Sequence, residues 1–113
     1  KRSHNKIEQW RYNIMPAATR IGDADATHCS TPFRAQGSPN VLVNGIPWSR
    51  QGDLNTVHLK PCGCPPCCCP HAMPIATGSS TVIVNGRGSG RIGDSIVACT
   101  SVAQGSPNVF AGG

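Results

Sequence analysis

The sequence predicts an all-β, irregular fold: a small pointed cone of three pseudo-threefold β-hairpin repeats, closed by the two ends of the domain and stapled by one metal ion. Three observations predict it. Short segments recur three times within the 113 residues. The 13 Gly and 10 Pro favour turns and short strands over long helices. His and Cys residues recur at one fixed distance from repeated glycines, and a metal would supplement the limited core of so short a chain.

The first repeated element reads as turn, strand and turn. It occurs as GSPNVLVNG at 37–45, GSSTVIVNG at 78–86 and GSPNVFAGG at 105–113. Two copies end in Asn-Gly after a short apolar run, at 44–45 and 85–86, which is a strong signal for a tight hairpin turn. We therefore expect a β-hairpin at each of these two positions.

A second element recurs as RIGD at 20–23, RQGD at 50–53 and RIGD at 91–94. Two units run from strand element to Gly-Asp turn without interruption, whereas the third is split between the segment 105–113 and the segment 15–23. This split predicts a closed ring in which Met15 lies beside Phe110. The predicted domain is 15–113, and residues 1–14 are interpreted as an N-terminal extension: a linker, tag remnant or flexible arm, with a docking arm as the alternative.

Metal ligands are predicted from the register of the repeat. The sixth residue after each repeated Gly, at 22, 52 and 93, is His28, His58 or Cys99 respectively. If the units surround one axis, these equivalent positions converge and supply three of the four ligands of a tetrahedral site.

The fourth ligand is predicted in an insertion. The repeated glycines are separated by 30 and then 41 residues, so the second unit carries about eleven extra residues between His58 and Gly78. His71 lies in this insertion, and a thiol of the same segment is the alternative ligand. One structural zinc is the expected cofactor, with iron as the alternative, because the donors are nitrogen and sulfur.

The insertion is also rich in cysteine. Its sequence, PCGCPPCCCPH, offers a second metal site or a local disulfide at Cys62, Cys64, Cys67, Cys68 and Cys69. The seven Cys form an odd number, three are consecutive, and no apolar signal-peptide core follows the basic start. These features favour a cytoplasmic, metal-binding use over an extracellular disulfide framework.

Several classes of function are disfavoured. Of the net charge of +5, residues 1–14 contribute +3, which leaves +2 and few aromatic residues for the domain, so nucleic-acid binding is poorly supported. The repeated Asp23, Asp53 and Asp94 follow an Arg by three positions, which indicates braced turns rather than catalytic acids. Asp25 has no evident partner base, and no nucleophile elbow, phosphate loop or zinc-protease helix is present.

These motifs resemble the PAAR-repeat family. PAAT at 16–19 is similar to the family's naming motif, RIGD to its continuation, and the GSPNV and VNG elements to its hairpins, over residues 15–113. The resemblance implies a cone with a zinc near its vertex, bound by His28, His58, His71 and Cys99. The chain departs from the family pattern in PAAT, in IPWS and GRGS of the later units, and in the Cys-rich insertion.

The resemblance also implies a function. Such a protein caps and sharpens the homotrimeric β-helical spike of a contractile injection machine, with one copy for each spike trimer, and helps it pierce the target cell envelope. We expect no enzymatic activity, assembly in the bacterial cytoplasm at the tip of a phage tail or secretion spike, and transient contact with the target membrane. An adaptor that mainly recruits a toxin effector is the alternative, followed by a zinc hydrolase, which would need an open coordination position.

Overall fold

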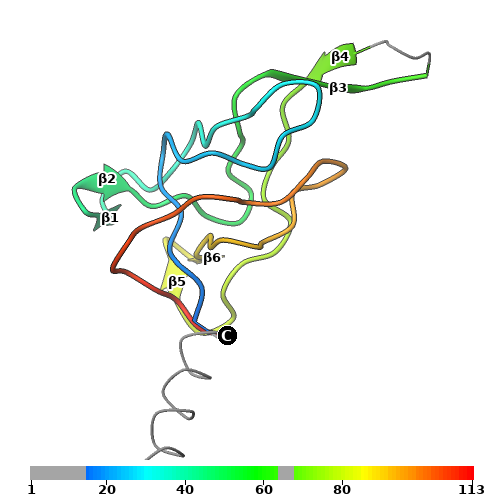
Figure 1. The fold of residues 1–113 in the computed structure, drawn as a ribbon. Coiled ribbons are helices and arrows are strands. Elements are labelled where there is room, and N and C mark those ends of the chain that lie inside the picture. The colour runs from blue at the N-terminus through cyan, green and yellow to red at the C-terminus, as the bar shows by residue number, and fades with distance from the viewer. Residues whose placement is uncertain (1–14, 64–67) are drawn as a thin grey trace, which may run out of the picture.

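The computed structural model describes residues 15–63 and 68–113, and these residues contain short strands and no helix. Three two-stranded antiparallel sheets are formed by β1–β2, β3–β4 and β5–β6 (Figure 1). The six strands are β1 (Leu42–Val43), β2 (Ile46–Pro47), β3 (His58–Pro61), β4 (Cys68–His71), β5 (Ile83–Val84) and β6 (Arg87–Gly88). The all-β fold predicted from composition and repeats is confirmed. In the described part of the chain, no helix has the length and apolar character needed to cross a membrane.

Two of the three repeats form the hairpins predicted at Asn-Gly. β1 pairs with β2 across Asn44-Gly45, and β5 pairs with β6 across Asn85-Gly86. Both turn residues have positive φ, 55° and 75° in the first turn and 54° and 78° in the second. Positive φ at both positions is what a two-residue type I′ turn requires, and Asn and Gly tolerate it best.

The third repeat is completed by the opposite end of the domain, as predicted. Ala17 and Phe110 form an antiparallel bridge. The amide N–H of Ala18 donates to the Val109 carbonyl at 2.9 Å, and the N–H of Ala111 donates to the Pro16 carbonyl at 3.0 Å. The third unit is therefore a pairing of two chain ends and not a continuous hairpin. The prediction for residues 1–14 lies outside the described residues.

A closed cycle of backbone hydrogen bonds joins the three units. The N–H of Thr19 donates to the Gly90 carbonyl (3.1 Å), that of Gly90 to the Ser49 carbonyl (2.8 Å), and that of Ser49 to the Thr19 carbonyl (3.0 Å). All three residues are buried. A side chain on Gly90 would not fit, because its Cβ would lie 2.7 Å from the Ser49 carbonyl oxygen. Gly90 thus allows the backbone of the third unit to approach those of the other two.

The Gly-Asp turns are braced as predicted. In each turn the Asp side chain accepts hydrogen bonds from the backbone N–H and the guanidinium of the Arg three positions earlier, at 2.8–3.3 Å. The glycines have φ of 90–92°, the value that the third position of a type II turn requires. The three pairs are Arg20–Asp23, Arg50–Asp53 and Arg91–Asp94.

The core is divided into two apolar clusters. The larger comprises Ala18, Val43, Trp48, Val84 and Ala111. It lies among β1–β2, β5–β6 and the paired segments around Ala17 and Phe110. We call these three elements together the hairpin end. The smaller comprises Ile75, Ile96 and Val102, with Cys99 and Met73 packed against it. The β3–β4 hairpin projects from the other side of the molecule, opposite β5–β6 and the C-terminus (Figure 1). We call that side the metal end.

Candidate metal centre

The four predicted ligands lie together at the metal end. One donor atom from each of His28, His58, His71 and Cys99 lies within 4.8 Å of the others, so this group could hold one metal ion. Cys99 Sγ is 2.9, 3.3 and 3.6 Å from the Nε2 atoms of His28, His58 and His71, and the last two Nε2 atoms are 2.8 Å apart. His58 is buried, and the other three are partly buried.

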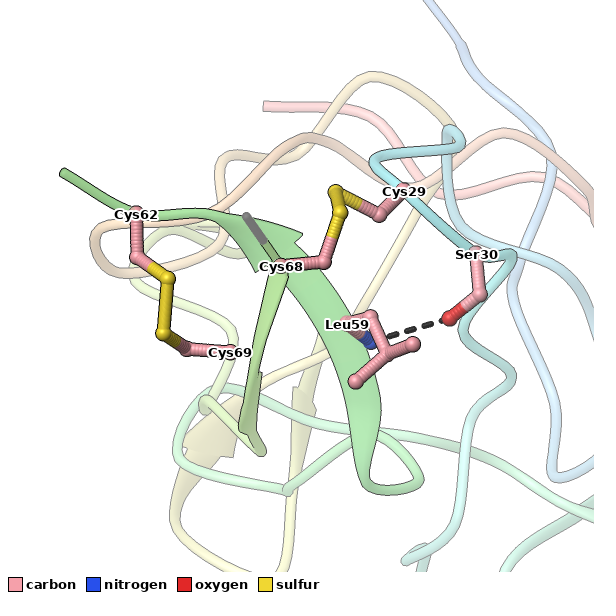
Figure 2. Close-up of a disulfide and its surroundings, with 6 residues drawn as sticks. All are labelled: Cys29, Ser30, Leu59, Cys62, Cys68 and Cys69. Carbon is pink, nitrogen blue, oxygen red and sulfur yellow. Dashed lines mark hydrogen bonds between the residues drawn. A yellow bond between two sulfur atoms is a disulfide. The ribbon is translucent and has the colours of Figure 1, made fainter. Parts of the chain in front are cut away.

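The β3–β4 hairpin and the loop beside it position three of these side chains. His58 opens β3 and is paired directly with His71 at the end of β4, so both side chains leave the same face of the hairpin. The His28 loop is tied to β3, because the N–H groups of Cys29 and Ser30 donate to the Leu59 carbonyl at 3.1 and 3.3 Å. Ser30 Oγ in turn accepts from the Leu59 N–H at 2.9 Å (Figure 2).

Cys99 reaches the site from a tight turn that follows the third Gly-Asp turn, at 91–94. Its N–H donates to the Ile96 carbonyl at 3.1 Å. Ala98 has φ of 46°, a left-handed conformation that costs a non-glycine residue about 1–2 kcal/mol. The hydrogen bonds of the turn therefore hold Ala98 in this conformation in spite of its cost in free energy. The turn in this form directs the Cys99 thiol toward the three imidazoles.

Electrostatics keep the imidazoles ready to bind a cation. Burial lowers the pKa of His28, and the neighbouring His58 and Lys60 lower it further. Burial likewise lowers the pKa of His71, with additional contributions from His58, Lys60 and His28. His58 Nδ1 lies 2.8 Å from the Thr56 carbonyl, which can only accept, so Nδ1 carries the proton and the Nε2 lone pair faces the cluster.

The donor set fits a tetrahedral metal ion. Zinc bound to three His and one Cys has Zn–N of about 2.0–2.1 Å and Zn–S of about 2.3 Å, which separates the donors by roughly 3.3–3.6 Å. Two of the three sulfur–nitrogen distances, 3.3 and 3.6 Å, lie in that range, whereas the third, 2.9 Å, and the Nε2–Nε2 distance of 2.8 Å are shorter. Without an ion, the lone pairs of three imidazole nitrogens and one sulfur would face one another with few protons between them. The group could therefore hold one metal ion through four protein donors.

The cysteine-rich insertion forms disulfides. Cys62 is bonded to Cys69, and Cys68 is bonded to Cys29, which belongs to the loop carrying His28 (Figure 2). The sequence predicted a second metal site or a local disulfide among the cysteines of the insertion, and Cys62–Cys69 is such a local disulfide. The general preference for metal-binding thiols over disulfides was wrong for Cys62, Cys68 and Cys69, and the partner Cys29 was not predicted. In the structure these sulfurs are bonded to each other in pairs and supply no thiolate. Cys64 and Cys67 lie outside the described residues.

The cross-link Cys29–Cys68 joins two ligand-bearing segments, because Cys29 follows His28 and Cys68 opens the strand that ends in His71. The only sign of this disulfide in the sequence is Cys29, an additional Cys next to the predicted ligand His28. The pairing has no counterpart in the other two repeats, so the repeat register could not reveal it.

Asp25 has a partner that sequence analysis did not identify. Its carboxylate lies 3.2 Å from Arg34 Nη2, and both side chains are fully buried. Burial raises the pKa of Asp25, and Arg34 opposes that shift. An ion pair of this kind is costly to bury unless its remaining hydrogen bonds are also made, and Asn55 makes one of them with Asp25 at 3.1 Å.

Fold and site together define a class: a small all-β protein with one His/Cys group able to hold a single metal ion. The chain belongs to the PAAR family, since the PAAR motif matches residues 23–99, about two thirds of the chain. PAAR proteins sit on the spike tip of injection systems and form a structural family that is not known for enzymatic activity. No curated protein matches this chain.

Proposed function

We propose that this protein caps a homotrimeric β-helical spike through its hairpin end, one copy for each trimer, and points its metal end at the target cell envelope. The observation that carries the proposal is an apolar residue exposed at the same position of each repeat. Leu42, Ile83 and Phe110 keep 55%, 55% and 38% of their surface exposed. Each directly precedes a core residue, so the strand alternates between solvent and core.

Three equivalent apolar positions suit a partner made of three equivalent chains. A homotrimer presents the same contact three times around its axis, and a single chain can match it only if its own surface repeats three times. The open end of a β-helix also exposes unpaired backbone groups, which short strands can cover by strand addition. These matches favour a cap over an adaptor that mainly recruits cargo.

The metal centre would make the opposite end rigid. We propose one zinc, with iron as the alternative, held by His28, His58, His71 and Cys99. Four protein donors leave no open position for a substrate or an activated water, which favours a structural role over hydrolysis. When bound, the ion would join three segments of the chain that are distant in sequence, and structural zinc contributes about 10–16 kcal/mol of apparent folding free energy in small peptides.

In this account the protein is assembled with the spike in the bacterial cytoplasm and is driven into the target envelope when the machine fires, with transient contact with the target membrane. In this proposal the injection machine supplies the force that drives the spike. The chain contributes a narrow shape and resistance to unfolding under force, so no chemical turnover is required.

Binding to the spike tests the proposal. The trimeric β-helical fragment of the spike from the same machine is mixed with this chain, and the complex is weighed by native mass spectrometry. One chain for each trimer is expected. Serine at all three apolar positions (Leu42→Ser, Ile83→Ser, Phe110→Ser) should abolish the complex, whereas Val97→Ser, an equally exposed apolar residue at the metal end, should leave it intact. Equal binding by both variants would contradict the proposal.

A further inference from the structure

A layer of three buried side chains lies directly behind the metal ligands. Asp25, Asn55 and Ile96 each precede a ligand by three residues, the same offset in all three repeats. Their exposed fractions are 2%, 2% and 4%. One of the three is apolar, as expected of a core position. The other two are polar and hydrogen-bonded to each other, which raises the question of what they do there.

Asn55 makes three side-chain contacts, one of them with a ligand. Its Oδ1 accepts from the Met73 backbone N–H at 2.9 Å. Its Nδ2 donates to Asp25 Oδ2 at 3.1 Å and lies 3.8 Å from Cys99 Sγ, a hydrogen bond of the length expected for sulfur. The amide therefore connects the second repeat to the first through Asp25 and to the third through Cys99.

The orientation of this amide is fixed by its partners. A backbone N–H can only donate, so the group that faces Met73 must be the amide oxygen. Nδ2 then faces the other way, and its two hydrogens match the two acceptors, Asp25 Oδ2 and Cys99 Sγ. An N–H group, and not an oxygen, is thus directed at the sulfur.

Arg34 completes the support behind Asn55. It holds the Asp25 carboxylate at 3.2 Å, and its Nη1 donates to the Asp53 carbonyl at 3.4 Å. The corresponding residue in the other repeats, judged by the N–H bond to the carbonyl of the Gly-Asp aspartate, is Ile75 or Val102. At this position the first repeat has a buried ion pair where the other two have an apolar side chain. Because Asp25 of that pair also accepts from Asn55, the polar groups of Arg34, Asp25 and Asn55 form one connected unit.

We propose that Asn55 is a positioning residue of the metal centre: its side-chain amide donates a hydrogen bond to Cys99 Sγ and holds that sulfur where it meets the three imidazoles, with Asp25 and Arg34 fixing the amide. The inference rests on the metal centre of the proposed function. Groups that orient metal ligands in this way commonly change metal affinity by 10–100-fold when they are removed.

Cobalt provides a readout that a merely structural role would not change. Co²⁺ takes the same nitrogen and sulfur donors as Zn²⁺ and gives a sulfur-to-cobalt charge-transfer absorption, whose energy falls when a hydrogen bond to the sulfur is lost. The full chain, wild type and variants, is stripped of metal and titrated with Co²⁺ for the spectrum. Zn²⁺ affinity is then measured in competition with a chromophoric chelator.

Asn55→Ala should shift the charge-transfer band to longer wavelength and weaken Zn²⁺ binding by about 10–100-fold. The matched control is Ile75→Val, which trims the apolar cluster beside Cys99 without touching the polar layer and should leave both readouts unchanged. Asn55 is not a positioning residue if Asn55→Ala gives the wild-type band and affinity.

A second variant covers the case in which Asn55→Ala does not fold. The double exchange Asp25→Asn with Asn55→Asp keeps the side-chain volumes, the net charge, the acceptor for Met73 and a hydrogen bond between the two residues. It replaces the N–H that faces the sulfur by an oxygen, and it also moves the carboxylate from residue 25, beside Arg34, to residue 55. Asp25→Asn alone, which loses the same carboxylate and keeps the N–H, separates the two changes. Weaker Zn²⁺ binding and a shifted band are expected of the double variant, and wild-type values would overturn the inference. If the wild-type chain itself binds neither Co²⁺ nor Zn²⁺, the proposed metal centre fails together with it.

Discussion

At the hairpin end the same interactions recur in every repeat, whereas at the metal end each repeat contributes something different. The hairpin end has three braced Arg–Asp turns, a cycle of three backbone hydrogen bonds and an apolar cluster fed by all three units. Among the described residues, the metal end has a group of three His and one Cys, two disulfides and a buried ion pair. Recurrent packing thus stabilises one end, and cross-links between unlike residues stabilise the other.

The difference follows from the size of each core. Five buried apolar residues form the cluster at the hairpin end, but only three form the cluster near the metal. A smaller apolar cluster buries less surface and therefore stabilises its end of the molecule less. Metal coordination and disulfides act between few atoms and need little interior volume, which suits them to the metal end.

The largest effect should come from removing a metal ligand. His58→Ala leaves three donors and opens the site to water, so we expect loss of the metal and of most of its contribution, about 10–16 kcal/mol for structural zinc in small peptides. Thermal unfolding with and without a chelator measures it. Val57→Ala alters the exposed neighbour of His58 and should melt like the wild type. A His58→Ala protein with unchanged melting and metal content would remove the distinction between the two ends.

The next effect should come from the disulfides, and it should depend on loop length. The cross-link Cys29–Cys68 closes a separation of 39 residues, and Cys62–Cys69 closes one of 7. Chain-entropy arguments give about 4 kcal/mol for the first and about 2 kcal/mol for the second. Denaturant unfolding of the paired Cys→Ser double variants, without reductant, checks the order. Equal losses, or a larger loss at Cys62–Cys69, would contradict the expected dependence on loop length.

A smaller loss of stability is expected when a side chain is added to the cycle of backbone hydrogen bonds at the hairpin end. Gly90→Ala puts a Cβ 2.7 Å from the Ser49 carbonyl and 2.9 Å from Thr19 Cγ2, and overpacking of this kind costs about 1–3 kcal/mol. Gly112→Ala, whose Cβ would meet nothing closer than 3.7 Å, is the matched control. Chemical denaturation of both variants measures the difference in the free energy of unfolding. A Gly90→Ala protein as stable as its control would show that the backbone cycle accommodates a Cβ at this position.

The smallest effect concerns the strained turn before Cys99. Ala98→Gly relieves a left-handed residue, which should offset the extra chain entropy of glycine and stabilise the protein by up to about 1 kcal/mol. Ala98→Val should do the opposite, since β-branching disfavours positive φ further. Melting temperatures of the two variants give the sign. Destabilisation by glycine would mean that Ala98 contributes packing that outweighs its backbone strain.

The hairpin end could be predicted from the sequence because its interactions repeat. Asn44 and Asn85 marked the turns, and the split third unit predicted the pairing of Ala17 with Phe110. Three of the four predicted ligands were found in the same way, since His28, His58 and Cys99 share one offset from a repeated Gly, whereas His71 was predicted from its place in the insertion. Their convergence is a property of the structure, and their role as ligands stays a proposal.

The parts that could not be predicted are those that break the repeat. Cys29 pairs with Cys68, and Asp25 pairs with Arg34, although none of the four residue types recurs at the equivalent positions of the other units. Which partners meet is decided by the packing of different units against one another. Sequence spacing within one unit carries no information on that geometry.

We propose that one metal ion holds the metal end of this protein together. Elemental analysis of the full chain with its two disulfides formed, giving the number of metal ions for each chain, measures this. One tightly held zinc or iron for each chain is expected, and His58→Ala should lose it. A wild-type chain that is folded and holds no metal would show that the four donors do not form a metal site.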